Sequence, residues 1–305
     1  MAEGPPLVLE LLPRCTFPPP GSALDCAVSG GADSLALLGL AVAAGCLVTA
    51  IHVDHGLRPG SAAEADVVAA AAGRLGAAFV SATVSVAPGS NLEARARAAR
   101  FAVLPEGVAT GHTMDDQAET ILLNLLRGAA SDGLAGMEPG WRHPLLGLRR
   151  CETLALCAAM ELMPVHDASN DDPAFLRNRV RHELLPLCAD MAGRDPVPLL
   201  ARQAGVLRDE AALLDALALQ SAPDPRDARL VAGLPRPLAR RAVRHWLRAR
   251  DPDAQEYPPS LAEVERVLAV ADGLAVATEI SRGRRVRRSG GRLTVDEPRS
   301  DSVGR

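Results

Sequence analysis

The chain has 305 residues, of which 48% are hydrophobic and only 2% aromatic, so it can form one large domain or two ordinary ones around a core of Leu, Val and Ala. All 33 basic residues are arginine, which excludes a Walker-type phosphate loop, because that loop requires a lysine on the phosphates. The net charge of −4 is unevenly divided, with 13 arginines against 20 acids in residues 1–189 and 20 against 17 in residues 190–305. A mildly basic back half beside an acidic front half suggests an anionic macromolecular partner.

The cysteines and the uncharged segments give no sign of a metal cluster, an exported protein or a membrane span. None of the six cysteines forms a Cys-x-x-Cys pair, which argues against an Fe–S or metal site and against a disulfide framework. The first residues do not combine a basic start with an apolar run, so no signal peptide is expected. Gly45 divides the longest uncharged stretch, 34–53, which we interpret as part of a buried β-α-β unit rather than a membrane helix. We therefore expect a cytoplasmic protein without a membrane partner.

Strand-like and helical segments alternate through the first 190 residues. Uninterrupted apolar runs predict strands near 24–28, 47–53, 78–86 and 106–111. Runs of this kind are typical of a parallel sheet that is covered on both faces. The segments between and after them predict helices near 34–44, 61–75, 91–104, 114–127 and 151–161. This alternation predicts a doubly wound, mostly parallel α/β domain.

The first predicted strand leads directly into Ser29, Gly30, Gly31, Ala32, Asp33 and Ser34. A buried strand, a glycine turn and a helix start together form an anion-binding loop, because the backbone N–H groups and the helix dipole converge on one point. Ser29 and Ser34 can donate hydroxyl groups to phosphate oxygens. Asp33 cannot favour a phosphate by its charge, so we expect it to face Mg²⁺ or a second substrate. The alternative is a glycine turn that merely joins a strand to a helix.

Polar groups also follow the second and fourth predicted strands, and ligands bind at these ends in such sheets. His52–Arg58 can bind a ligand or simply form a turn. Gly111–Thr120 opens a helix with Asp115, Asp116 and Glu119 in its first turns. These acids either complement the helix dipole, or hold Mg²⁺ or a cationic substrate.

Two arginine-rich segments are candidate phosphate contacts, since arginine pairs well with phosphate oxygens. Asn91–Arg100 predicts a basic helical face, for which the alternative is a solvated face with Glu–Arg pairs. Arg177, Arg179 and Arg181 place three arginines within five residues near the end of the first domain.

The pattern changes at about residue 190, and we place a domain boundary there. Domain 1–190 is expected to be the α/β domain with the anion-binding loop, and domain 191–305 to be smaller and mostly helical. Its predicted helices are 196–219, 235–250 and 259–271, followed by short strands at 275–281, 284–288 and 292–295. Gly290-Gly291 predicts a hairpin turn between the last two strands. Arginines cluster in two places, where they either contact an anionic partner or form solvated faces: Arg240, Arg241, Arg244 and Arg248, and then Arg284, Arg285, Arg287 and Arg288.

The loop 29–34 resembles the pyrophosphate-binding loop of the ATP pyrophosphatases, the N-type PP-loop family with an adenine nucleotide alpha hydrolase-like fold. Further segments appear in the order of one branch of that family: His52–Arg58, Asn91–Arg100, Gly111–Glu119, Arg127-Gly128 with Gly133-Leu134, and Asn170 with Arg177–Arg181. Through this ordered set, which covers most of residues 22–190, the chain is similar to the tRNA(Ile)-lysidine synthetase family. The back half resembles that family's tRNA-binding part only loosely. The resemblance implies that domain 1–190 binds ATP and catalyses, and that domain 191–305 binds tRNA.

The resemblance implies a ligase that uses ATP and Mg²⁺ to attach free L-lysine to C2 of the wobble cytidine of tRNA(Ile) with anticodon CAU, through an adenylated cytidine. It implies that ATP contacts Ser29, Gly30, Gly31, Ala32, Asp33, Ser34 and His52, with Asp33 also at the metal. It implies that Asp116 and Glu119 bind lysine, and that Asp33, His112, Asp115 and Arg97 lie at or near the reacting centre. It implies that Arg177, Arg179 and Arg181 contact the tRNA. We also predict tRNA contacts for Arg241 and Arg244 of the back half.

Three alternatives remain open. A tRNA cytidine thiolase has the same loop, but it is expected to carry cysteine pairs. A small-molecule amide-forming enzyme, such as an NAD or GMP synthetase, does not explain the arginines at 177–181. A catalytically silent nucleotide- or RNA-binding module does not explain an intact loop with Asp33. Oligomeric state is open as well, with a homodimer as one alternative.

Overall fold

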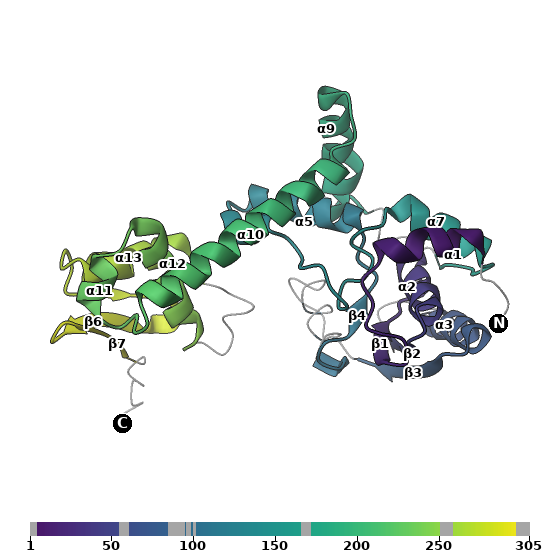
Figure 1. Cartoon of the computed structure of the whole chain (residues 1–305), viewed down its shortest axis with the longest axis horizontal. Coiled ribbons are helices and arrows are strands. Elements are labelled where there is room, and N and C mark those ends of the chain that lie inside the picture. Colours follow the sequence, from purple (N-terminus) through teal and green to yellow (C-terminus); the bar gives the residue numbers. More distant parts are fainter. Residues whose placement is uncertain are drawn as a thin grey trace. The chain divides into compact units, whose positions relative to one another are not determined.

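The computed structural model describes residues 5–54, 61–84, 95, 99, 102–165, 172–250 and 259–296 (Figure 1). The chain divides into two compact units, Met1–Leu207 and Arg208–Arg305. The division falls inside one long helix, α10 (Val197–Ser221), C-terminal to the boundary that we placed at 190/191. The helix continues through the junction despite Gly205 nearby, so the sequence pattern marks where composition changes and not where packing changes.

The first unit is built on a four-stranded parallel sheet in the order β3-β2-β1-β4, which confirms the predicted α/β fold. Its strands are β1 (Ala23–Ala27), β2 (Leu47–Asp54), β3 (Ala78–Thr83) and β4 (Ala109–Thr110). The chain moves outward from β1 through β2 to β3, and β4 then lies on the other side of β1. The strand order therefore reverses between β1 and β4, the point at which such sheets bind ligands beyond their carboxyl ends.

β4 is shorter than the strand that we predicted over 106–111. Only Ala109 and Thr110 pair with β1, because Gly107 adopts a left-handed turn at φ +81° just before them. Glycine enters that region without a steric penalty and so ends the extended run. The predicted strand 78–86 ends at residue 83 in β3.

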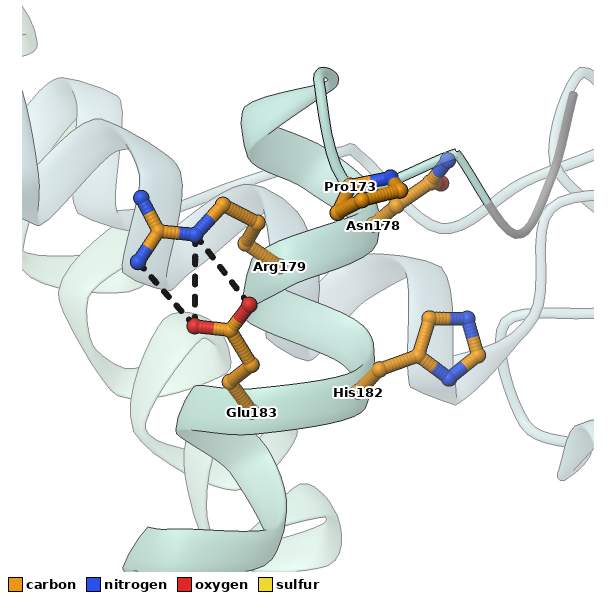
Figure 2. Close-up of a pocket in the computed structure, with 5 residues that line it drawn as sticks. All are labelled: Pro173, Asn178, Arg179, His182 and Glu183. Carbon is orange, nitrogen blue, oxygen red and sulfur yellow. Dashed lines mark hydrogen bonds and ion pairs between the residues drawn. The ribbon is translucent and has the colours of Figure 1, made fainter.

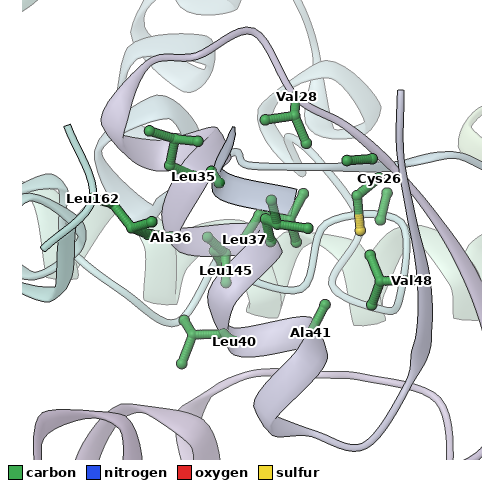
Figure 3. Packing of buried hydrophobic residues seen from close by; sticks show 14 of the residues in the cluster. Cys26, Val28, Leu35, Ala36, Leu37, Leu40, Ala41, Val48, Leu145 and Leu162 are labelled. Atoms are coloured by element: carbon green, nitrogen blue, oxygen red, sulfur yellow. The ribbon is translucent and has the colours of Figure 1, made fainter. Parts of the chain in front are cut away.

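Helix α2 (Ala32–Ala43) lies at the centre of the first unit's core. It is apolar on all sides, and a helix of that kind is stable only when it is buried. Leu35, Leu37 and Leu40 are each 0% exposed, and Figure 3 shows them among strand and loop residues such as Val48 and Leu145. This packing fixes the first turn of α2, and with it the preceding loop, against the sheet.

The predicted helices 61–75, 114–127 and 151–161 are present as α3, α5 and α7, whereas most of the predicted helix 91–104, including Arg97, lies outside the described residues. The helical segments of this unit besides α2 and α10 are α1 (Pro6–Leu11), η1 (Leu12–Arg14), α3 (Ser61–Leu75), α5 (Met114–Leu126), α6 (Ser131–Leu134), α7 (Arg150–Ala159), α8 (Leu176–Arg179), η3 (Val180–Leu184) and α9 (Leu185–Ala192).

The second unit is mostly helical and ends in an antiparallel sheet of order β5-β6-β7, as predicted. Gly290 and Gly291, at φ +57° and +79°, form the expected two-residue turn. Helix α11 is missing from our prediction, because its five residues are too few to show a helical period. After α10 the elements are α11 (Ala228–Ala232), α12 (Arg236–Arg248), α13 (Leu261–Ala271), β5 (Ala277–Glu279), η4 (Ser281–Gly283), β6 (Arg285–Ser289) and β7 (Arg292–Asp296).

Across the described ranges of both units, no helix combines the length and the apolar character needed to cross a membrane.

Candidate active site

The loop after β1 and the segment after β4 come into backbone contact at Gly111. A Cβ atom on Gly111 would lie 2.6 Å from the carbonyl oxygen of Asp33 and 3.0 Å from the amide nitrogen of Ser34. Contacts under 3.0 Å are essentially never made by a real Cβ atom, so only glycine fits here. The loop 29–34 and the start of α5 are therefore held side by side, as expected for the reversal point of the sheet.

The loop is shaped by its own glycines and serines. Gly30 adopts φ +89°, a conformation that favours glycine. The Ser29 amide donates to Ser34 Oγ at 3.1 Å, and Ser34 Oγ donates to the Gly31 carbonyl at 2.8 Å. Gly31 is the N-cap of α2, and in the described structure no side chain caps this helix. The Ser34 N–H donates within this turn to the Gly31 carbonyl at 3.1 Å, so Ala32 and Asp33 provide the first-turn N–H groups that can donate to an external anion.

His52 supports the loop from β2. It is 2% exposed, and its Nδ1 lies 2.9 Å from the carbonyl oxygen of Val28, the residue before the loop. Because a carbonyl only accepts, Nδ1 carries a proton, and Nε2 of the neutral ring is then an acceptor. Within the described residues, Nε2 is buried without a hydrogen-bond partner.

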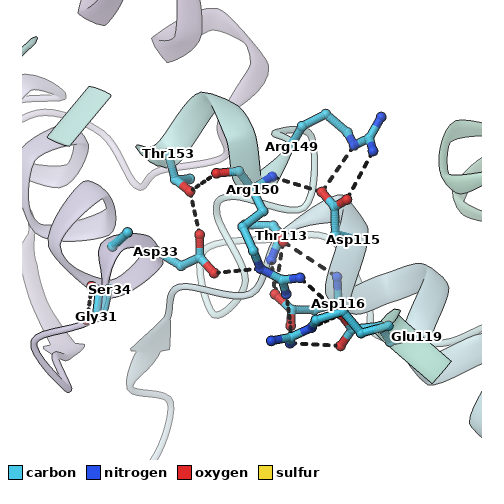
Figure 4. Close-up of polar contacts among 12 residues, drawn as sticks. Gly31, Asp33, Ser34, Thr113, Asp115, Asp116, Glu119, Arg149, Arg150 and Thr153 are labelled. Atoms are coloured by element: carbon cyan, nitrogen blue, oxygen red, sulfur yellow. Dashed lines mark hydrogen bonds and ion pairs between the residues drawn. The ribbon is translucent and has the colours of Figure 1, made fainter. Parts of the chain in front are cut away.

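Asp33, in the first turn of α2, is held by helix α7 (Figure 4). Its Oδ1 accepts from the hydroxyl of Thr153, and its Oδ2 lies 3.3 Å from Arg150 Nε. Burial raises the pKa of Asp33 above its ordinary value, against the opposing effect of the Thr153 and Arg150 donors. The carboxylate is therefore an energetically unfavourable charge that faces the start of α7.

Asp115 fixes the start of α7. Its two oxygens lie 3.0 Å from Arg149 Nη2 and 3.1 Å from Arg149 Nε, and its Oδ2 accepts from the backbone N–H of Arg150 at 2.8 Å. Burial opposes ionisation, but the donors of Arg149 and Arg150 outweigh it and lower the pKa of Asp115. Arg149 also pairs with Asp195. Asp115 thus joins the first turns of α5 and α7.

Asp116 has a structural contact on one oxygen and two guanidinium contacts on the other. Its Oδ2 accepts from the backbone N–H of Thr113 at 2.8 Å and from the Thr113 hydroxyl at 2.9 Å, which completes a capping box for α5. Its Oδ1 lies 2.8 Å from Arg150 Nη2 and 3.0 Å from Arg177 Nη2. Burial is again outweighed, here by Arg150 and Arg177, and the pKa of Asp116 is lowered.

Glu119 lies one turn further along α5, and its side chain is 0% exposed. Arg150 Nη1 and Arg181 Nε lie 3.0 and 2.7 Å from its Oε1, and Arg177 Nε lies 2.8 Å from its Oε2. A buried carboxylate is stable only with this kind of pairing. We call Asp116 and Glu119 the acid pair.

His112 follows β4 and belongs to a small polar group around Thr110. His112 Nδ1 and His143 Nδ1 lie 2.7 and 2.9 Å from Thr110 Oγ1, and that hydroxyl also lies 3.2 Å from the Arg142 carbonyl. The hydroxyl has one proton, so when it donates to Arg142 both histidines donate from Nδ1. In that arrangement the Nε2 atom of His112 is the nitrogen that can accept a proton.

The arginines at 177, 179 and 181 do not share one face. Arg177 and Arg181, one helical turn apart, both lie on the acid pair. Arg179 points away and pairs with Glu183 at 3.0 Å. Figure 2 shows this pair beside a surface pocket of about 260 Å³ that Pro173, Asn178 and His182 also line. A phosphate contact by Arg177 or Arg181 therefore requires it to share or leave a carboxylate, and the tRNA role of all three stays a prediction.

Several back-half arginines are paired within the second unit. Arg241 is 9% exposed and lies 2.5 Å from Asp215, which also accepts from His245 at 2.9 Å. Arg244 lies on the same helix, α12, and is half-buried. Arg284 is 8% exposed and donates to backbone carbonyls. Exposed arginines of this unit include Arg240, Arg248, Arg285 and Arg287.

Sequence reasoning missed Arg149, Arg150 and Thr153, which hold the site's carboxylates, and His143 beside His112. A signal was present for the two arginines, because basic residues at a helix N-terminus oppose the helix dipole. Two adjacent arginines immediately before a predicted helix therefore indicate acidic partners from elsewhere in the fold.

Comparison with protein families defines the class of this site. The PP-loop domain matches residues 12–188, more than half of the chain, and this range contains the loop 29–34 and the acid pair. The chain is thus a PP-loop protein, with an ATP-binding domain.

Individual relatives narrow the class further. The chain is 45% identical over 245 residues to the tRNA(Ile)-lysidine synthase of Nocardia farcinica. The matched region covers 76% of this chain and 77% of that protein. It is 46% identical over 237 residues to the tRNA(Ile)-lysidine synthase of Mycolicibacterium paratuberculosis, with 73% of each chain covered. The chain belongs to the tRNA(Ile)-lysidine synthase family, as the resemblance of its motifs predicts.

A solved structure supports the fold. The U34-tRNA thiolase NcsA from Methanococcus maripaludis, with its [4Fe-4S] cluster, matches with a TM-score of 0.52 over 66% of this chain and 80% of that chain, at 16% identity. At this identity the likeness concerns the fold alone.

Proposed function

We propose that this protein ligates free L-lysine to C2 of the wobble cytidine in a tRNA(Ile) with anticodon CAU, and that it converts ATP to AMP and pyrophosphate. The observation that carries the proposal is the contact between a phosphate-binding loop and the acid pair through Arg150. The loop suits a polyphosphate and the acid pair suits an ammonium group, so one site accommodates both small substrates. The similar proteins from Nocardia and Mycolicibacterium are tRNA(Ile)-lysidine synthases.

In the first step, the C2 oxygen of cytidine attacks the α-phosphorus of ATP, and the bond from that phosphorus to pyrophosphate breaks. The N–H groups of the loop and the N-terminus of α2 stabilise the charge of the departing pyrophosphate. Ser29 and Ser34 lie within the same loop and add hydroxyl donors. The adenylated oxygen is a much better leaving group, so one difficult displacement becomes two easier ones.

In the second step, the ε-amine of lysine attacks C2, the bond from C2 to the adenylated oxygen breaks, and AMP leaves. The acid pair holds an ammonium group of lysine near the reacting carbon. We assign to His112 the proton that the attacking amine releases, because its Nε2 can accept a proton while Nδ1 is bonded to Thr110. Arg97 and Asp115 stay candidates near this centre, and Asp115 also orients α7.

Mg²⁺ fits the chemistry of the loop. Magnesium in phosphate sites is bound by one or two carboxylates together with substrate phosphates, and Asp33 provides one carboxylate at the edge of the loop. Among the described side chains, no group of three or more His, Cys, Asp or Glu residues is arranged to hold a metal by itself, so the phosphates would complete the coordination. When bound, the ion neutralises charge on the phosphates.

We assign tRNA binding to the exposed arginines of the second unit and to Arg179, and catalysis to the first unit. ATP, lysine and tRNA are all cytoplasmic, so we also propose a cytoplasmic location. A homodimer stays a prediction.

The direct test is to incubate the full chain with total tRNA, ATP and labelled lysine. We expect label in tRNA that depends on ATP, with one pyrophosphate released for each lysine incorporated. No lysine incorporation together with ATP-dependent sulfur incorporation from a sulfur donor would favour a thiolase. ATP binding without tRNA-dependent ATP–pyrophosphate exchange would indicate a silent binding module.

A further inference from the structure

Arg150 contacts three carboxylates from two different parts of the fold. Its Nε lies 3.3 Å from Asp33, its Nη1 lies 3.0 Å from Glu119 and its Nη2 lies 2.8 Å from Asp116. Asp33 belongs to the phosphate loop, and the other two are the acid pair. Arg150 thus joins the two groups through its own side chain.

The acid pair is fully engaged by cations. Arg150, Arg177 and Arg181 donate to Glu119, and Arg150 and Arg177 donate to Oδ1 of Asp116. Together with Asp33, three carboxylates face three guanidinium groups, so the cluster is close to neutral. The other oxygen of Asp116 is used by the capping box of α5.

A cationic substrate must therefore compete with guanidinium groups for these oxygens. Arginine remains protonated at all accessible pH values, so a displaced guanidinium keeps its charge. The side chain of Arg150 is 23% exposed and its partner Glu119 is 0% exposed, which makes an unpaired charge here unfavourable. Displacement becomes favourable when another anion receives the guanidinium.

The phosphates of a nucleotide in the loop 29–34 are such an anion. They would lie beside Asp33, which Arg150 already contacts, and a guanidinium binds phosphate oxygens through paired hydrogen bonds. Arg150 can thus transfer from the acid pair to phosphate while the first turn of α7 stays in place, because Asp115 holds the Arg150 backbone N–H at 2.8 Å.

We propose that Arg150 is a positioning residue that makes the acid pair accessible to the ammonium group of lysine only when nucleotide phosphates occupy the loop. This inference rests on the proposed function, in which the acid pair binds lysine. The two small substrates then bind synergistically, and by linkage each raises the affinity of the other by the same factor. Lysine therefore binds when ATP, which activates the cytidine oxygen, is already in the site.

The test is a calorimetric titration of L-lysine into the full chain, with and without Mg²⁺ and α,β-methylene-ATP, which resists cleavage at the α–β position. For the natural sequence we expect the analogue to lower the lysine Kd by between about 5- and 150-fold, the usual range of such coupling. Titration of the analogue with and without lysine should give the same factor.

Variants at position 150 test whether the coupling between lysine binding and nucleotide binding depends on Arg150. Arg150→Ala should bind lysine with nearly the same Kd in both conditions, and more tightly than the natural sequence does without the analogue. Arg150→Lys, which keeps the charge without the planar fork, should restore part of the coupling. Arg14→Ala is the matched control, because Arg14 forms an ion pair with Glu152 in the same first turn of α7 but lies away from the acid pair. It should keep the coupling of the natural sequence.

The outcomes separate the two proposals. A lysine Kd that is identical with and without the analogue in the natural sequence overturns the coupling, while the lysine site stands. Natural coupling in Arg150→Ala overturns the role of Arg150 alone. No lysine binding in either condition overturns the lysine site and this inference together. If Arg150→Ala fails to fold, as judged by its melting curve, Arg150→Gln, which keeps a neutral donor on a shorter side chain, takes its place with the same expectation.

Discussion

Asp115 holds Arg149 through both carboxylate oxygens, at 3.0 and 3.1 Å, and so joins the first turn of α5 to the residue that caps α7. This ion pair is part-buried. Arg150, the residue after Arg149, donates its backbone N–H to the same Asp115 carboxylate. Together with Glu152, which accepts from the Arg149 backbone N–H at 2.7 Å, Asp115 holds the start of α7, so it has a role in stability beside its predicted place near the reacting centre.

Asp115→Asn should lower the free energy of unfolding at pH 7 by about 1.5–3 kcal/mol, the usual contribution of hydrogen bonds to a charged group. Since the folded-state pKa of Asp115 is lowered, its stabilisation is present above the ordinary carboxyl pKa of about 4 and is lost as the pH falls through the lower folded value. Urea unfolding at several pH values measures the difference between variant and natural protein. A difference that has already vanished at pH 6 contradicts this account.

Asp33→Asn should reduce tRNA-dependent pyrophosphate release by about 10²- to 10³-fold, the range found when a preorganised electrostatic contact is removed. The same variant should melt at a higher temperature than the natural protein at pH 7. Burial raises the pKa of Asp33, so the ionised form is disfavoured in the fold, and a neutral isostere relieves it. Normal pyrophosphate release by Asp33→Asn or Asp33→Ala would contradict a role of Asp33 in binding the metal or in stabilising the transition state.

Gly111→Ala should impair both nucleotide binding and stability, because the new methyl group meets backbone and not a flexible side chain. The overlap with the Asp33 carbonyl at 2.6 Å forces the phosphate loop away from α5. We expect at least a tenfold weaker ATP affinity in a direct binding assay. Gly73→Ala is the control, since Gly73 lies in α3 and a methyl group added there would meet nothing within 4 Å. Alanine in a helix should stabilise by up to about 1 kcal/mol relative to glycine.

Glu119→Gln and Asp116→Asn should raise the lysine requirement by roughly ten- to hundredfold, because each removes a charge-assisted contact of about 1.5–3 kcal/mol. The ATP requirement should change much less. Truncation to alanine at Glu119 is a poorer test, since an unpaired buried charge destabilises by about 3–5 kcal/mol. Glu183→Gln, which alters an exposed pair with Arg179, serves as the control. A lysine KM equal to that of the natural protein in both variants would leave these acids with a purely structural role.

Neutralising the exposed back-half arginines should weaken tRNA binding and leave ATP binding unchanged. The variants are Arg240→Gln with Arg248→Gln, and Arg285→Gln with Arg287→Gln. Each lost phosphate contact should reduce the slope of log affinity against log salt by about 0.7–0.9. Arg14→Gln in the first unit controls for net charge. An unchanged affinity and slope with both pairs removed would move the RNA site to the region of Arg177–Arg181.

Local sequence was sufficient to place the strands β1 and β2, the loop 29–34 and the acids at the start of α5, because each of these depends on residues close together in the chain. The arginine contacts could not be predicted in the same way, because Arg150 meets Asp33 only through packing of distant segments. The split of Arg177 and Arg181 from Arg179 is a partial exception. We predicted Arg177, Arg179 and Arg181 as one group of phosphate contacts, although residues four apart share a helix face and a residue between them does not. The spacing was therefore a signal for two roles that our prediction did not use.

The long helix α10 and the short strand β4 show where local patterns are insufficient. Helix α10 runs uninterrupted through the division between units, and the single glycine near that point, Gly205, does not end it. The apolar run 106–111 alone does not give the length of β4, because the turn at Gly107 ends its extended backbone and only Ala109 and Thr110 pair with β1.

The cluster around the acid pair contains guanidinium groups and no primary amine. A protonated guanidinium is not a nucleophile, whereas a lysine side chain in the same place would attack an activated ester in its own active site. Since the chain contains no lysine at all, an adenylated base held here meets no amine from a protein side chain. The site can thus keep an electrophile intact without self-modification until an amine arrives from solution.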